Sequence, residues 1–225
     1  MIGELVAERC YETGNSEIME SDINRNSRGE NLKTGLTLTR AKASDLQMYL
    51  YFETERLVVR QYKLNDIDGL ILIMSDSRVH TYTKDRNNPW DKQRTEAYIK
   101  YMMDKDFRTL DCFHGAVIEK KTSQLIGLCG LNPYKTDEPE IEFKLGVPYW
   151  GKGYATELGR KMIKEAFAST AIKGIYGMAQ PENIASRKVL EKIGMKYVGN
   201  QIFRNHEDSF YYIANSDGQN VRKEI

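Results

Sequence analysis

The stretch from Pro139 to Gly159 reads PEIEFKLGVPYWGKGYATELG, and it constrains the fold more than any other part of the chain. Between Glu140 and Leu145 charged and apolar side chains alternate, which predicts a strand that carries its charged residues on one face. Pro148 has no N–H to donate to a neighbouring strand, so we expect the strand to end before it. Apolar residues then recur with helical spacing from Ala155 onward, which predicts a helix.

The turn between this strand and this helix carries two glycines, Gly151 and Gly153. Glycine tolerates positive φ and lets a ligand come close to the backbone, and the free N–H groups at the positive end of a helix suit a phosphate. Two nucleotide-binding patterns fit poorly. The P-loop G-x-x-x-x-G-K-[ST] is absent, and a dinucleotide fingerprint would need a third glycine where Thr156 stands and an acidic residue about 20 residues further on. A strand–turn–helix connection without a ligand would use the same glycines.

The turn resembles the acetyl-CoA-binding segment of the GNAT superfamily of N-acetyltransferases, whose pattern is [RQ]-x-x-G-x-[GA]. Gly153 and Ala155 match this pattern, and Trp150 stands where arginine or glutamine is usual. The unbroken YWGKGYATE from Tyr149 to Glu157 is similar to the branch that acetylates the N-termini of ribosomal proteins.

Two further blocks extend the resemblance to roughly residues 52–214. PENIASRKVLEKIGMKYVG, from Pro181 to Gly199, is similar to the N-x-x-S-x-x-[VL]-[LY]-x-K-x-G-[FM] segment of the family. ETERLVVRQYKLNDIDGL, which begins at Glu53, is similar to the family's opening.

The resemblance implies an α/β (α+β) fold with a mixed, mostly antiparallel central sheet, helices on both faces and a splayed pair of cofactor-binding strands. It implies acetyl-CoA as the acyl donor, no metal, and direct transfer to an amine acceptor, either a protein N-terminus or a small-molecule amine. By position, the cofactor-binding residues it implies are Leu145, Gly146, Val147, Trp150, Gly151, Lys152, Gly153, Tyr154, Ala155, Thr156, Asn183 and Ser186.

Amide formation needs a neutral amine and a proton for the departing thiolate. At pH 7 a lysine amine costs about 4.6 kcal/mol to deprotonate, whereas an α-amine costs only about 1 to 1.4 kcal/mol. Glu140 and Glu142, on one face of the predicted strand, are candidates for relaying the amine proton, and the alternative is that both are solvent-facing strand carboxylates. Many relatives place a tyrosine in the later helix as general acid. The corresponding SRKVLEK has none, and Ser186 is the nearest hydroxyl.

The composition restricts partners and location. Lys and Arg number 33 against 32 Asp and Glu, a formal charge of +1, so nothing in the balance favours nucleic acid or an anionic membrane. Three cysteines without a C-x-x-C pair and three scattered histidines argue against zinc, and sparse cysteine suits a reducing cytoplasm. No apolar run approaches about 18 residues. We therefore expect a cytoplasmic protein, monomeric or homodimeric.

Composition and the extent of the family resemblance divide the chain into a polar N-terminal extension (residues 1–50), an acetyltransferase domain (51–215) and a polar tail (216–225). In the domain, residues 81–94 are irregular and basic, with Trp90 either a packing anchor of a solvated loop or a residue that grips substrate. Further elements expected from pattern are helices over 65–74, 91–106 and 183–193, and strands over 56–62, 112–119, 124–132, 174–179, 196–204 and 209–214. The function predicted is an N-acetyltransferase, and the alternative is a non-catalytic acyl-CoA sensor or scaffold.

Overall fold

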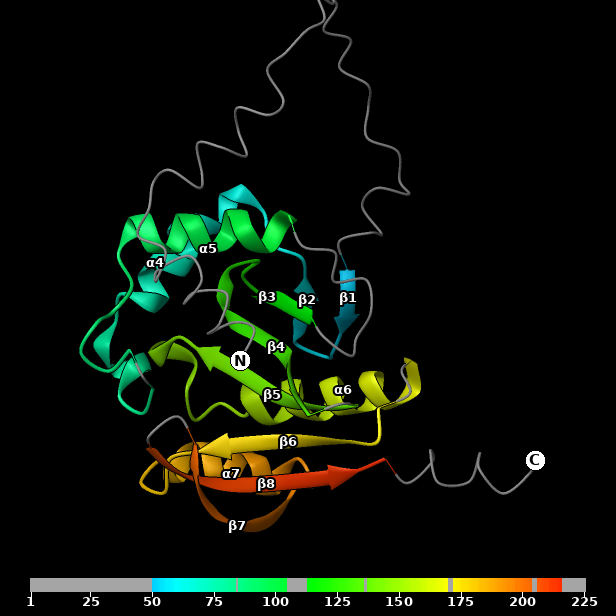
Figure 1. Ribbon diagram of the computed structural model, residues 1–225. Coiled ribbons are helices and arrows are strands. Elements are labelled where there is room, and N and C mark those ends of the chain that lie inside the picture. The colour runs from blue at the N-terminus through cyan, green and yellow to red at the C-terminus, as the bar shows by residue number, and fades with distance from the viewer. Residues whose placement is uncertain are drawn as a thin grey trace, which may run out of the picture. The chain divides into compact units, whose positions relative to one another are not determined.

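The computed structural model describes residues 50–83, 85–104, 113–135, 137–169, 172–203 and 206–215. The predicted extension and tail lie outside these residues, apart from Leu50, and remain predictions. Within the described part, eight strands form one sheet (Figure 1). The strands are β1 (Leu50–Glu53), β2 (Leu57–Arg60), β3 (Phe113–Glu119), β4 (Leu125–Lys135), β5 (Glu138–Leu145), β6 (Gly174–Ala179), β7 (Lys196–Phe203) and β8 (His206–Ala214).

The strand order is β1-β2-β3-β4-β5-β6-β8-β7. Every neighbouring pair is antiparallel except β5 and β6, which are parallel. The expected mixed, mostly antiparallel sheet is therefore confirmed. The parallel pair follows from the chain path, because a crossover helix joins β5 to β6 whereas hairpins join β3 to β4 and β4 to β5.

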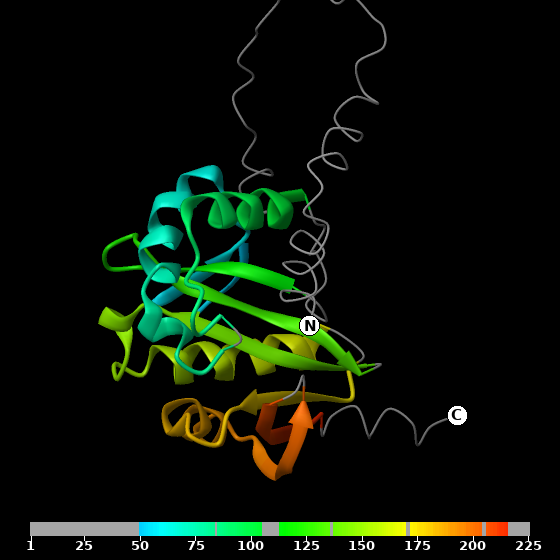
Figure 2. The ribbon, with the colours of Figure 1, turned by 60° about the vertical axis from the view of Figure 1, so that its left-hand side comes forward.

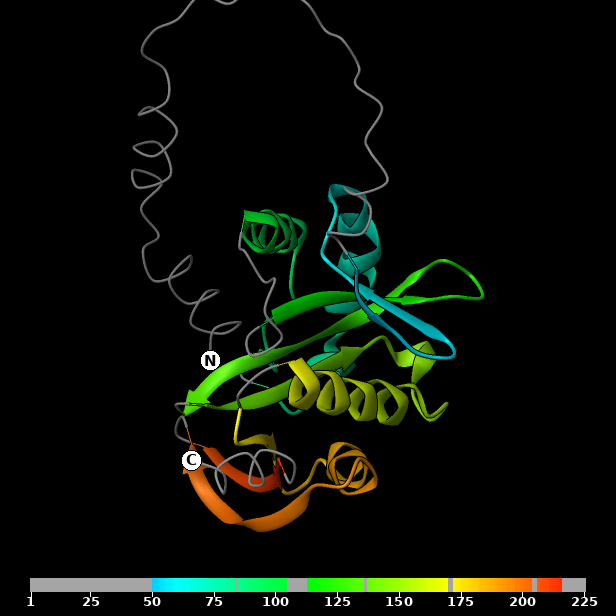
Figure 3. The ribbon, with the colours of Figure 1, turned by 90° about the vertical axis from the view of Figure 1, so that its right-hand side faces the viewer.

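Helices lie on both faces of the sheet (Figure 2 and Figure 3). One face carries α4 (Ile67–Met74) and α5 (Lys92–Asp104), and the other carries α6 (Tyr154–Ser169) and α7 (Ile184–Lys192). The central strand β3 is buried along its whole length, as its apolar FHGAVIE suggests. On α6 the residues at helical spacing that face the sheet are buried: Leu158, Met162, Ile163 and Ala166. No helix in the described part of the chain is both long enough and apolar enough to cross a membrane.

The elements predicted from pattern are present, with shifts at their ends. Strand β1 was missed, because its sequence LYFE shows no alternation of polar and apolar residues, and its one buried side chain, Phe52, packs edge-on against Phe113. The helix expected from residue 65 begins at Ile67, and Asp66 is its N-cap residue without a side-chain capping hydrogen bond. Asp66 instead accepts from the Lys63 N–H at 2.8 Å and pairs with Arg60 at 2.7 Å, so a short 3-10 turn, η1 (Leu64–Asp66), precedes the helix.

Candidate cofactor-binding and active site

The parallel strands β5 and β6 pair at only one position, Glu140 with Tyr176, and their arrows diverge toward the carboxyl ends (Figure 1). On its other edge β5 is fully paired with β4, and just beyond its end the Gly146 N–H donates to the Ile126 carbonyl at 2.9 Å. Because backbone groups alternate between the two edges of a strand, those of Phe143 and Leu145 point toward β6. These groups therefore lie along the open edge, and Phe143 is a residue that the sequence did not single out.

The Trp150 side chain occupies one of the backbone groups on the open edge of β5. Its indole Nε1 donates to the Leu145 carbonyl at 2.7 Å, while its ring remains 49% exposed. The short turn η3 (Val147–Tyr149) lies between them, and the Val147 carbonyl accepts the Trp150 N–H at 3.1 Å. A tryptophan thus stabilises the strand end at the place where the family pattern usually has arginine or glutamine.

The glycine turn follows at residues 151–153. Gly151 has φ of +72° and Gly153 has φ of +81°, both in the left-handed region that favours glycine. Among the residues that the structure describes, none accepts a hydrogen bond from the backbone N–H groups of residues 151–156. A Cβ added at Gly151 would meet nothing within 4 Å. The turn thus presents open N–H groups at the start of α6, an arrangement that suits a phosphate.

The first turn of α6 is tied to the segment that joins β1 to β2. Arg56 Nε lies 2.6 Å from Glu157 Oε2, and the Thr54 hydroxyl donates to Glu157 Oε1 at 2.5 Å. The Tyr154 hydroxyl donates to Glu119, so its side chain is turned into the protein and only its backbone faces the turn. Sequence reasoning did not assign Arg56 or Thr54, because their partner lies about a hundred residues further along the chain.

Asn183 caps α7, since its Oδ1 accepts the Ser186 N–H at 3.1 Å. No acceptor for the Asn183 side-chain N–H groups is found among the described residues. Ser186 is half-buried in the first turn of α7. Leu190, at the [LY] position of the family pattern, is buried at 2% exposure. The capping role of Asn183 thus leaves its amide nitrogen available to a ligand.

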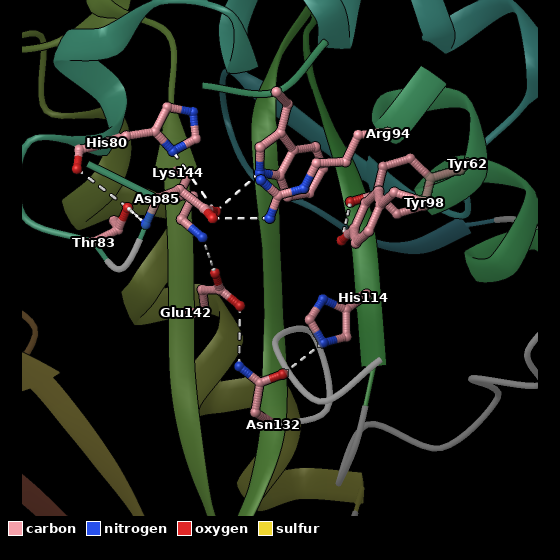
Figure 4. A network of polar contacts seen from close by, with 11 residues as sticks. Tyr62, His80, Thr83, Asp85, Arg94, Tyr98, His114, Asn132, Glu142 and Lys144 are labelled. Atoms are coloured by element: carbon pink, nitrogen blue, oxygen red, sulfur yellow. Dashed lines mark hydrogen bonds and ion pairs between the residues drawn. The ribbon is translucent and has the colours of Figure 1, made fainter. Parts of the chain in front are cut away.

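Glu142 lies in a buried polar network on the α5 side of the sheet (Figure 4). Lys144 Nζ is 2.6 Å from its Oε1, and Asn132 Nδ2 donates to its Oε2 at 3.0 Å. Since Asn132 uses Nδ2 here, its Oδ1 accepts from His114 Nε2 at 2.6 Å. Burial acts to raise the pKa of Glu142, but the Lys144 ammonium, His114 and the two hydrogen bonds outweigh it and hold this pKa well below its ordinary value.

Glu140 has a different environment on the same strand. It is half-buried at the point where β5 and β6 still pair. Burial raises the pKa of Glu140 to about 7, and the carboxylates of Glu142 and Asp208 add to the effect. The strand therefore carries one carboxylate held ionised by a lysine and one that titrates near neutrality.

The loop that leads into α5 docks on the same network. Asp85 is buried and accepts from Trp90 Nε1 and Arg94 Nη2, both at 2.9 Å, and Lys144 lies between Asp85 and Glu142 (Figure 4). Trp90 is only 5% exposed, so it is a packing residue. The prediction that the residues around it are solvated is wrong for Asp85 and Arg94, whose side chains are largely shielded from solvent and form an ion pair. His80 is fully buried and donates through Nε2 to the Met74 carbonyl at 2.7 Å.

Cys129 lies in the core of β4, and burial raises the pKa of its thiol, which disfavours the nucleophilic thiolate. In the described ranges no group of three or more His, Cys, Asp and Glu side chains could hold a metal ion.

The mixed eight-stranded sheet with helices on both faces is the fold of a GNAT acetyltransferase. The family model described as an acetyltransferase (GNAT) domain matches residues 56–196, and the chain belongs to this family. It is similar to the uncharacterized N-acetyltransferase p20 of Bacillus licheniformis, with 31% identity over 68% of this chain and 85% of that protein.

Solved structures agree with the fold. A GNAT-family acetyltransferase from Bacillus anthracis is 25% identical, covers 75% of this chain and 99% of its own, and has a TM-score of 0.64. The spermidine N-acetyltransferase of Vibrio cholerae, in complex with CoA and spermine, is 20% identical over 73% of this chain and 98% of its own, with a TM-score of 0.59.

Proposed function

We propose that the protein transfers an acetyl group from acetyl-CoA directly to a primary amine, in a ternary complex of enzyme, donor and acceptor. The observation that carries the proposal is the arrangement around β5. The strand separates from β6 just beyond Glu140, and it leads into a turn whose N–H groups have no acceptor among the described residues. A donor thioester between the strands would lie beside a carboxylate whose pKa is about 7.

The residues available to the cofactor fall into three groups. The backbone N–H groups of residues 151–156 fit the diphosphate, with the Lys152 ammonium nearby on the exposed turn. The open edge of β5, with the Phe143 backbone groups, the Leu145 N–H and the Val147 N–H, fits the amide groups of the pantetheine arm, while the Leu145 carbonyl is bonded to Trp150. The Gly146 N–H is not available to the cofactor, because it donates to the Ile126 carbonyl on the β4 side of the strand. Asn183 offers its side-chain amide from the start of α7.

In the mechanism that we propose, Glu140 acts as general base. It accepts a proton from the acceptor ammonium, directly or through one water, and the neutral amine then attacks the thioester carbonyl carbon. A base is most effective when its pKa lies near the operating pH, which favours Glu140 over Glu142. The Val147 N–H, which no described residue accepts, is placed to polarise the carbonyl oxygen.

Breaking the carbon–sulfur bond releases a thiolate, which needs a proton. We assign this proton to Ser186 or to a water molecule, because Leu190 stands where a tyrosine would otherwise supply it. The attacking nitrogen loses its second proton as the amide forms, and that proton restores the donor. Glu142 keeps its charge throughout. Its role in the proposal is to fix Lys144 and Asn132 and so to shape the floor of the acceptor site (Figure 4).

For the acceptor we propose an amine of low pKa, foremost the α-amine of a peptide or protein. Glu140 at about pKa 7 is a weak base, so it matches an amine that costs about 1 to 1.4 kcal/mol to deprotonate better than one that costs about 4.6 kcal/mol. The YWGKGYATE segment supports the ribosomal-protein N-terminal branch. The basic loop over residues 81–94 would repel a polyamine less than its composition suggests, since Arg94 pairs with Asp85.

Two measurements test the proposal. Initial rates at varied concentrations of acetyl-CoA and amine should give intersecting double-reciprocal lines, as a ternary complex requires. Intact-mass analysis after incubation with acetyl-CoA alone should show no acetylated enzyme. Parallel lines with an acetylated enzyme would contradict direct transfer, and tight acetyl-CoA binding without thiol release for any amine would favour the sensor alternative.

A further inference from the structure

Arg56 contacts the glycine turn and the start of α6 from outside the segment that forms them. Its Nε is 2.6 Å from Glu157 Oε2, and its Nη1 donates to the Lys152 carbonyl at 3.0 Å. The guanidinium carbon lies 4.3 Å from the centre of the Tyr154 ring, which is a cation–π distance. One side chain therefore contacts the turn, the first helical residue and the acidic residue of the first helical turn.

The backbone around Arg56 reinforces this contact. The Arg56 N–H donates to Glu157 Oε1 at 2.9 Å, and Oε1 also accepts from the Thr54 hydroxyl. Glu157 is itself bonded to the turn, because its N–H donates to the Gly153 carbonyl at 3.0 Å. Burial acts to raise the pKa of Glu157, but Thr54 and Arg56 outweigh it and lower this pKa, so the carboxylate stays ionised.

The third guanidinium nitrogen, Nη2, faces Gly153. It lies 3.5 Å from the position that a Cβ on Gly153 would take, and no other heavy atom of the described residues lies within 4 Å of that position, apart from Gly153 itself and its two chain neighbours. None of the described residues accepts a hydrogen bond from Nη2. The side chain is 40% exposed, so the turn is bounded on this side by a positive charge that remains open to solvent.

We propose that Arg56 is a positioning residue for the diphosphate of the acyl donor. By holding the Lys152 carbonyl and Glu157 at once, it keeps the N–H groups of residues 151–156 directed outward before the donor binds. A guanidinium can do this because its nitrogens form a rigid planar fork, which a lysine ammonium lacks. The inference rests on the proposed function, since it takes this turn as the diphosphate site.

The test uses Arg56→Lys in the full chain and two acyl donors. Acetyl-CoA carries the diphosphate, and acetyl-pantetheine lacks it. We expect the calorimetric Kd and the KM for acetyl-CoA to rise about tenfold, as loss of one charge-assisted contact predicts. For acetyl-pantetheine, kcat/KM should equal that of the wild type.

The matched control is Arg160→Lys. Arg160 lies on the same helix and donates from Nε and Nη2 to the Lys192 carbonyl, at 3.2 and 2.8 Å, away from the turn. Arg160→Lys should leave the Kd and KM for acetyl-CoA and the kcat/KM for acetyl-pantetheine at their wild-type values. Glu157→Gln removes the charge that orients Arg56. It should raise the Kd and KM for acetyl-CoA by a smaller factor and leave acetyl-pantetheine unaffected, and it replaces Arg56→Lys as the test if Arg56→Lys does not fold.

The possible outcomes distinguish the role of Arg56 from the proposed function. If the wild type binds acetyl-CoA and Arg56→Lys binds it equally well, the role of Arg56 is refuted alone. If both donors lose the same factor, Arg56 is an ordinary fold contact. If the wild type binds no acetyl-CoA, the proposed function is refuted and the role of Arg56 falls with it.

Discussion

Glu140 and Glu142 stand two residues apart on one face of β5, yet their surroundings move their pKa values in opposite directions. Sequence alternation predicted the shared face but not this difference. The difference arises from Lys144, Asn132 and His114, which come from three strands and meet only in the folded sheet. Pairs of carboxylates with divergent pKa values are a common basis for assigning catalytic roles.

Replacing Glu140 by Gln should lower kcat by at least about 100-fold near pH 7, because it removes the proposed general base. In the wild type, kcat should rise with pH through about 7, as Glu140 loses its proton. This titration should vanish in the variant, and the deficit should shrink at high pH, where hydroxide and neutral amine bypass the base. Glu138→Gln, on the same strand, is the control. A pH-independent deficit in Glu140→Gln would point to a structural role.

The same variant makes a separate prediction about stability. A carboxyl whose folded pKa is raised from 4.5 to about 7 stabilises the fold while it is protonated, and this contribution is lost as pH rises through 7. Glu140→Gln should therefore raise the thermal midpoint at pH 8 relative to the wild type and leave it nearly unchanged at pH 4. Equal shifts of the thermal midpoint at pH 4 and pH 8 would show that the pKa of Glu140 is not raised in the folded protein.

Glu142→Gln should reduce the free energy of unfolding by about 1–3 kcal/mol, since it leaves the half-buried Lys144 ammonium without an ionised partner. The folded pKa of Glu142 is depressed, so its contribution is present above its ordinary value of 4.5 and is lost as pH falls below it. Urea unfolding at pH 7 and pH 3.5 measures both effects. The exposed Glu182→Gln is the control, and a change below about 0.5 kcal/mol for Glu142→Gln would contradict the account.

At the scale of elements, the segment from β5 through the turn into α6 was predictable because its signals are local. Alternation, two glycines and helical periodicity all fall within about twenty consecutive residues. β1 was not predicted, because LYFE shows no alternation of polar and apolar residues. The contact of Arg56 with Glu157 was not predicted either, because it joins positions 101 residues apart. Long-range polar pairing therefore sets the limit of sequence reasoning here.

The turn makes its own prediction through Gly153→Val. With φ of +81°, a side chain at this position should cost about 1–3 kcal/mol of strain, and it would lie beside Arg56 Nη2. We expect calorimetry to show loss of acetyl-CoA binding while circular dichroism shows a folded protein. Gly69→Ala, on α4 with an ordinary 3.4 Å contact to Leu125, is the control. Unchanged affinity in Gly153→Val would remove the turn from the cofactor site.

For the whole molecule, the sheet begins at β1 within the described residues, and we predict that the domain begins there too. A chain that lacks residues 1–48 keeps β1, Thr54 and Arg56, so we expect it to bind acetyl-CoA with the affinity of the full chain. A chain that lacks residues 1–54 loses β1 and one bond to Glu157, and we expect its affinity to fall. Calorimetry on the two truncations measures this. Insoluble or non-binding protein from the shorter deletion would show that the first 48 residues belong to the domain.

The central claim is that this acetyltransferase acylates an amine of low pKa. It is tested most directly by the initial rate of thiol release from acetyl-CoA across one panel of acceptors, namely N-terminal peptides, spermidine, an aminoglycoside and free amino acids. The account predicts the highest kcat/KM for an α-amine, with acetylation of that amine confirmed by mass. Rapid turnover of spermidine with none on any α-amine would contradict the account.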